Sequence, residues 1–150
     1  MANVADVATY ILESKGSMTA MKLQKLVYYS QAWHLVWEDR PLFSETIEAW
    51  ANGPVAPALY SQHRGVFMVD ELKGDLSQIE DFEKTSIDAV LEHYGSKTSY
   101  ELSELTHRES PWLQARDGAA AGARSTKEIS LGSMQEYYSA LLSFDDGLEN

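Results

Sequence analysis

A chain of 150 residues with 44% hydrophobic residues is long enough to bury the core of one domain. It has no cysteine, which excludes disulfides, a thiol nucleophile and cysteine-liganded zinc. Acidic residues outnumber basic ones by 23 to 12, and the net charge of −11 argues against nucleic acid as a partner. No apolar run approaches the roughly 18 residues that span a membrane, and the N-terminus lacks the pattern of a signal peptide. We therefore expect a cytoplasmic protein that binds neither nucleic acid nor membrane.

Two helices are predicted in the first 40 residues. The first is amphipathic, and Gly16 is placed to end it. The second spans residues 19–38 with Thr19 as its N-cap, and apolar residues occupy nearly its whole circumference. Because such a helix must be buried on most sides, we expect it to be the central element of the fold.

Residues 42–69 contain the β-like part of the chain. The segments 47–50 and 66–69 have strand-forming residues, so a short two-stranded ribbon between them is considered. A turn is predicted at residues 52–54, and a short helix at 57–63 has Pro57 in its first turn.

The second half of the chain is predicted to be helical. The spacing of a capping box occurs three times, at Ser77 with Glu80, Thr98 with Glu101, and Ser133 with Glu136. A turn of helix is predicted near residues 111–113. Residues 117–126 are small and polar and predict a mobile loop, and residues 145–150 form an acidic tail. The sequence thus predicts a single, mainly α domain over residues 1–150.

The acidity is concentrated in residues 70–92, which hold eight acidic and two basic residues. One interpretation is a solvated face that aids solubility. The other is a surface that attracts a basic partner protein.

No catalytic or metal-binding spacing is found among the four histidines. His34 lies among apolar residues of the central helix, where we expect a core histidine bonded to Gln31 or to a backbone carbonyl. His107 lies at a helix end, where a protonated imidazole would interact favourably with the helix dipole. We therefore expect no catalytic residue, no metal and no cofactor. A hydrolase or metal-dependent enzyme using His34 or His107 is the least favoured alternative.

The chain is rich in large aromatic residues, with four Trp and eight Tyr. They can serve to fill the core. They are also the residue types that contribute most to protein–protein binding.

Three segments resemble the Panacea domain family, whose members are also described as SocA-like or GepA-like prophage-associated antitoxins. They are MKLQKLVYYSQAWHL at residues 21–35, then PLF at 41–43 with IEAW at 47–50 and NGPV at 52–55, and LSELTHRESPW at 102–112. The segments occur in the family's order, and the resemblance extends over most of residues 5–140.

The resemblance implies a mainly helical domain that acts as the antitoxin of a type II-like toxin–antitoxin system. Such a protein neutralises a cognate toxin by binding it directly. One family member hands its toxin to a bacterial protease of the ClpXP type, so the alternative function is that of a proteolytic adaptor. Whether the chain forms a homo-oligomer is left open.

The family's recurring residues are expected to be largely architectural, and the partner-binding surface is expected among exposed aromatic and charged residues. Core residues are expected at Leu23, Leu26, Val27, Trp33, His34, Gly53, Pro54 and Trp112. The partner-binding surface is expected near Trp37, Glu48, Trp50, Asn52 and Tyr60.

Overall fold

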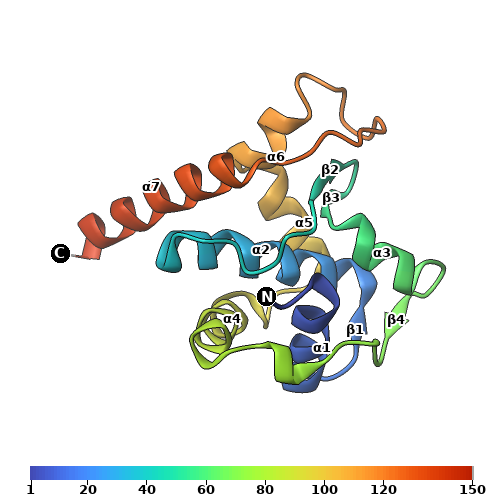
Figure 1. The fold of residues 1–150 in the computed structure, drawn as a ribbon. Coiled ribbons are helices and arrows are strands. Elements are labelled where there is room, and N and C mark those ends of the chain that lie inside the picture. The colour runs from blue at the N-terminus through green and yellow to red at the C-terminus, as the bar shows by residue number, and fades with distance from the viewer. Residues whose placement is uncertain (150) are drawn as a thin grey trace.

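The computed structural model describes the backbone of residues 1–149 and the side chains of residues 1–143. Its helices are α1 (Val4–Lys15), α2 (Ala20–Glu38), α3 (Pro57–His63), α4 (Asp81–Tyr94), α5 (Ser99–His107), α6 (Ser110–Ala115) and α7 (Leu131–Glu149), with the 3-10 turn η1 (Leu76–Gln78) before α4 (Figure 1). Four short strands complete the fold: β1 (Met18–Thr19), β2 (Glu48–Trp50), β3 (Gly53–Val55) and β4 (Met68–Val69). The predicted mainly α class is confirmed. None of the described helices combines the length and hydropathy needed to cross a membrane.

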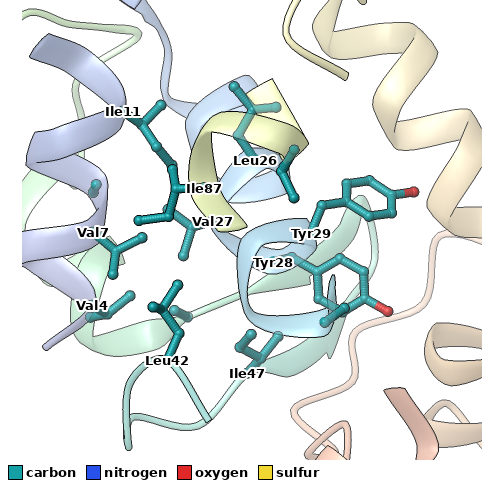
Figure 2. Packing of buried hydrophobic residues seen from close by; sticks show 14 of the residues in the cluster. Val4, Val7, Ile11, Leu26, Val27, Tyr28, Tyr29, Leu42, Ile47 and Ile87 are labelled. Atoms are coloured by element: carbon teal, nitrogen blue, oxygen red, sulfur yellow. The ribbon is translucent and has the colours of Figure 1, made fainter. Parts of the chain in front are cut away.

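Helix α2 runs through the middle of the molecule, and every residue from Leu23 to Leu35 is buried. Helices α1, α4, α5 and α7 pack against it (Figure 1). Figure 2 shows part of the apolar core around it, where Val27 of α2, Val7 of α1 and Ile87 of α4 lie close together. The prediction of a central helix buried on most sides is confirmed.

Two buried glutamines of α2 bind the backbone of irregular segments. The Gln31 side chain accepts from the Leu42 N–H at 2.6 Å and donates to the Phe43 carbonyl at 2.8 Å. Gln24 accepts from the Ala56 N–H at 2.9 Å, and its amide nitrogen lies 3.4 Å from the Ala56 carbonyl. A buried backbone group without a partner costs free energy, so these bonds fix the segments that lead into β2 and α3.

A buried network of hydroxyls and one carboxyl joins α2 to α6 and α7. The hydroxyls of Tyr29 and Tyr138 donate to the same oxygen of Glu109, at 2.6 and 2.8 Å. The Tyr28 hydroxyl lies 3.1 Å from that of Tyr138. Burial raises the pKa of Glu109, while the two tyrosine hydrogen bonds act in the opposite direction.

His34 joins α2 to α4, and the expected bond to Gln31 or a backbone carbonyl is wrong. Its Nδ1 lies 2.8 Å from the Ser86 Oγ. The Gln31 amide instead binds the backbone at residues 42 and 43. Next to it, the Trp33 indole N–H donates to the Tyr94 hydroxyl at 2.9 Å and ties α2 to the end of α4.

The strands pair differently from the predicted ribbon. β2 pairs antiparallel with β3, with Trp50 opposite Gly53, and β1 pairs antiparallel with β4. Only Ala51 and Asn52 separate Trp50 from Gly53, so β2 can fold back on the neighbouring residues at a small cost in loop entropy. The predicted pairing of residues 47–50 with 66–69 is therefore wrong, although both segments are strands in part.

Two of the predicted helix starts are displaced by a few residues. Helix α4 has Glu80 as its N-cap in a capping box with Glu83, and Ser77 lies inside η1 instead. At the start of α7, the Ser130 Oγ accepts from the Ser133 N–H at 3.1 Å, so Ser130 provides the cap expected of Ser133. Other predicted helix ends are confirmed: Gly16 ends α1, Thr19 caps α2, Pro57 lies in the first turn of α3, and Thr98 forms a capping box with Glu101.

Residues 117–126 form an irregular loop between α6 and α7. The Arg116 guanidinium donates to the carbonyls of Ala120 and Ala123, at 3.0 and 2.7 Å, and to that of Ala49 in β2 at 3.1 Å. Arg116 thereby attaches the loop to the β2–β3 hairpin, while the mobility of the loop stays a prediction. Of the predicted acidic tail, the backbone of residues 145–149 belongs to α7; its side chains and residue 150 lie outside the described residues.

Replacing Gln31 with leucine is expected to lower the free energy of unfolding by about 2–5 kcal/mol, because the Leu42 N–H and the Phe43 carbonyl would be buried without partners. Chemical denaturation measures the change. Gln62→Leu, at an exposed position of α3, is the control and is expected to stay within about 0.5 kcal/mol. Equal stabilities of the two variants would contradict the role given to Gln31.

Candidate partner-binding pocket

A pocket of about 600 Å³ opens between the first half of α2, the β2–β3 hairpin, α3, the loop that follows α3, and residues 124–126. These segments are far apart in the sequence and meet at one side of the molecule (Figure 1). Trp50, Asn52 and Tyr60 line the pocket, so the structure brings together three of the five residues expected to bind a partner.

The hairpin lies against the lysine side chain that forms the pocket floor. Gly53 has a φ of +125°, a conformation that residues with a side chain rarely adopt. A Cβ at this position would overlap the Cε of Lys25. Glycine therefore allows both the backbone conformation of the hairpin and its close approach to α2.

Lys25 is 1% exposed, and its side chain lines the pocket from below. Among the residues that the structure describes, it has neither a hydrogen-bond nor an ion-pair partner. Burial lowers the pKa of Lys25 to about 8, because removal from water disfavours the charged form. At pH 7 the amine is still mostly protonated, and the pocket has a cationic floor.

Gln24 and His63 form the polar part of the pocket. The Gln24 amide nitrogen lies 2.9 Å from the His63 Nε2. Since the other amide atom of Gln24 accepts from the Ala56 N–H, the NH₂ group faces His63 and donates to it. His63 Nε2 is thus an acceptor, which requires a neutral ring, and burial lowers the pKa of His63 in agreement with this assignment.

Aromatic rings in edge contact form one wall. The ring of Tyr60 lies 5.0 Å from that of Trp50 and 5.4 Å from that of His63, measured between centroids. The Trp50 indole N–H donates to Glu48 at 2.8 Å, and the Trp50 carbonyl accepts from the Trp112 indole at 2.8 Å. The wall is therefore held in place by α3 on one side and by α6 on the other.

The rim of the pocket is apolar and exposed to solvent. It consists of Met21, Val66 and Phe67, which are 38%, 47% and 77% exposed, and we call these three residues the apolar rim. Large solvent-exposed apolar side chains beside a pocket are typical of surfaces that bind other proteins.

The other two expected partner-binding residues lie elsewhere. Glu48 is half-buried in β2, where it accepts from the Trp50 indole and does not line the pocket. Trp37 is 41% exposed and stacks on Trp33 near the end of α2. Twelve residues of helix separate it from Lys25, about 18 Å along the axis. It borders a separate cavity of about 340 Å³ together with Phe82 of α4.

All eight residues expected in the core occupy buried positions. Six of them belong to helices: Leu23, Leu26, Val27, Trp33, His34 and Trp112. Gly53 and Pro54 are buried in β3.

The histidines of the alternative enzyme hypothesis lie apart from the pocket lining. The Nε2 atoms of His34 and His107 are buried without a hydrogen-bond partner, and the His107 ring stacks on Trp112 at 4.2 Å. Burial lowers the pKa of both histidines. For His107, the loss of hydration outweighs the opposing effects of Glu104 and of the Asn52 backbone, so burial favours the neutral ring at this helix end. The described residues also include no group of three or more acidic, histidine or cysteine side chains placed to hold a metal ion.

The sequence interpretation missed the other residues of the pocket lining, among them Met21, Lys25, His63 and Phe67. Lys25 could have been noticed as a charged residue in a helix without a polar face. Phe67 was assigned to a β segment because of its neighbours Val66 and Met68. No pattern in the sequence places the loop of Phe67 beside the start of α2.

Comparison with known proteins gives one family. The family model described as "Antitoxin SocA-like, Panacea domain" matches residues 23–113, which include α2 from Leu23 onward, the hairpin, α3, α4, α5 and part of α6. Neither the curated proteins nor the solved structures give a significant match.

Gly53→Ala is expected to lower the free energy of unfolding by about 2 kcal/mol or more, because alanine would adopt a strained φ and would overlap the Lys25 stem. Gly132→Ala is the control. Gly132 lies in the first turn of α7 with open space around its Cα, and alanine is expected to raise stability there by up to about 1 kcal/mol. Equal effects in thermal unfolding would contradict the close approach at Gly53.

The free energy of unfolding is expected to fall as the pH drops from 7 to 5. The pKa values of His34, His63 and His107 are lowered in the fold, so the unfolded chain, with histidine pKa values near 6.5, takes up protons first. In His63→Gln, glutamine can still accept from Gln24 but does not titrate. The free energy of unfolding of this variant should depend less steeply on pH than that of the wild type. An unchanged slope of unfolding free energy against pH would exclude His63 as a contributor to the pH dependence.

Proposed function

The chain belongs to the family of SocA-like antitoxins that carry a Panacea domain, and we propose that it neutralises a cognate toxin protein by binding it directly. The binding surface in this proposal is the pocket at the first half of α2 together with its apolar rim. The mechanism is occupation of the toxin by a stable complex, as in type II toxin–antitoxin systems.

The observation that supports this surface is the exposure of the apolar rim. Phe67 is 77% exposed although it stands beside a pocket with aromatic walls. Exposed apolar side chains gain free energy when a partner covers them, and rigid aromatic rings lose little conformational entropy on binding. Most of the pocket, including Trp50, Tyr60 and Phe67, lies within the residues that match the family.

The acidic segment adjoins this surface in the chain. Residues 70–92 begin directly after β4, which follows the rim residues Val66 and Phe67. Negative charge beside an apolar surface accelerates association with a basic protein. We infer that the toxin has a basic surface around an apolar contact.

Coexpression with the protein encoded by the adjacent gene tests the proposal. That protein is expected to be toxic alone and harmless together with this chain, and the two should elute as one complex in size-exclusion chromatography. Measuring the amount of toxin in the cell separates binding from degradation. Loss of the toxin without a recoverable complex would contradict the proposal and favour delivery to a protease.

Phe67→Asp is expected to weaken toxin binding by about 2 kcal/mol, or roughly 30-fold, because it places a charge in the apolar contact. The matched control is Tyr100→Asp, since Tyr100 is 72% exposed and does not line the pocket. Both variants should unfold at nearly the wild-type temperature. Equal toxin affinity of the two variants, measured by titration calorimetry, would exclude the rim from the interface.

A further inference from the structure

The pocket has a charge opposite to that of the chain as a whole. Its lining includes two basic residues, Lys25 at the floor and Arg124 at the edge, and no Asp or Glu. The complete chain has 23 acidic and 12 basic residues. A basic partner that is attracted only by the negative net charge of the chain would gain no binding energy from a cationic pocket floor.

Lys25 is the side chain that defines what the pocket can bind. The Lys25 side chain is almost wholly buried and its ammonium has no anion beside it among the described residues, an arrangement that is unfavourable in the free protein. None of the neighbouring polar groups compensates the charge. The Gln24 amide binds Ala56 and His63, Gly53 contributes no side chain, and Asn52 and Thr106 are neutral.

The titratable groups that line the pocket beside Lys25 are basic or neutral. His63 of α3 is a neutral acceptor for Gln24, and Arg124 lies at the pocket edge. Outside the lining, His107 of α5 is close enough for the charge of Lys25 to contribute to its lowered pKa, and Glu104 of the same helix acts on His107 in the opposite direction. Tyr60 completes the wall. An anion that enters the pocket therefore meets the ammonium without competition from a carboxylate of the lining.

We propose that the pocket binds an acidic side chain of the toxin, held by the Lys25 ammonium, with a neighbouring apolar residue of the toxin against Trp50, Tyr60 and the apolar rim. The volume of about 600 Å³ accommodates two side chains of this kind. This proposal rests on the function proposed above, because the toxin is the protein that supplies the carboxylate. The chemistry of the pocket can be tested without the toxin.

The first experiment uses the wild-type chain and two blocked dipeptides, acetyl-Phe-Glu-amide and acetyl-Phe-Gln-amide. They differ only in the carboxylate. NMR of the Lys25 ε-carbon in lysine-labelled protein is expected to show at least about tenfold tighter binding of the Glu peptide. That peptide should also raise the pKa of Lys25 above its value of about 8 in the free chain. Equal binding of the two peptides, or no binding of either, would overturn the proposal.

The second experiment uses Lys25→Met, which keeps most of the side-chain volume and removes the charge. Since the charge is buried without a partner, this variant is expected to unfold at least about 2 °C above the wild type. Its toxin affinity should fall by about 30-fold or more, and its preference for the Glu peptide should disappear. If Lys25 had a purely structural role, the Lys25→Met variant would be less stable than the wild type and its toxin affinity would be unchanged. Lys22→Met is the control, because Lys22 donates to the Gly95 carbonyl outside the pocket and should not affect binding.

The two proposals fail in different ways. If the wild type does not bind the adjacent-gene protein, the function is wrong, while the dipeptides still decide the chemistry of the pocket. If the toxin binds Lys25→Met as tightly as wild type, the function stands and the assignment of the carboxylate to the toxin is overturned. Toxin affinity should also decrease as the pH rises through 8, because the amine loses its charge, and Lys25→Met should lack this decrease.

Discussion

The structure depends on a helix that is buried on every side but still carries polar side chains. Most of the long buried polar side chains of α2 bond to groups outside the helix, since the backbone bonds of the helix are already made. Gln31 binds the segment before β2, His34 binds α4, and Tyr29 binds the start of α6. These bonds have fixed directions, in contrast to apolar contacts, and so they determine where each surrounding segment lies.

The same helix also builds the pocket, which connects folding with binding. Met21, Gln24 and Lys25 come from its first two turns and provide the rim, the polar side and the floor. Two of the three are unusual for a central helix: Met21 is partly exposed, and the charge of Lys25 is buried without a partner in the described chain. An exposed apolar side chain and an unpaired buried charge do not favour stability, which is typical of positions that serve binding.

The central helix, the helix caps near it and the mainly α class could be predicted because they depend on local spacing. The pairing of the strands could not be predicted. Whether a strand pairs with a neighbouring or a distant segment depends on tertiary contacts, such as those that bring residues 18–19 beside residues 68–69. For the pocket, the richness in aromatic residues pointed to Trp50 and Tyr60. Trp37 lies several turns further along α2, outside the pocket, and its part in partner binding stays a prediction. Lys25 stands out in the sequence as a charged residue of an apolar helix, but its place beneath the hairpin depends on the tertiary contact with Gly53.

The family match ends at residue 113, whereas the pocket is completed by Arg124 and its neighbours. This last wall belongs to a loop that is attached through backbone groups: Arg116 donates to the carbonyls of Ala120 and Ala123, and the residues that follow the wall pair with the backbone of β2. Backbone groups are present whatever the side chains are. Substitutions at residues 124–126 can therefore alter the shape and charge of the pocket opening while the floor of the pocket is unchanged. In the binding mode proposed above, the specificity of the opening can thus change without a change in the core.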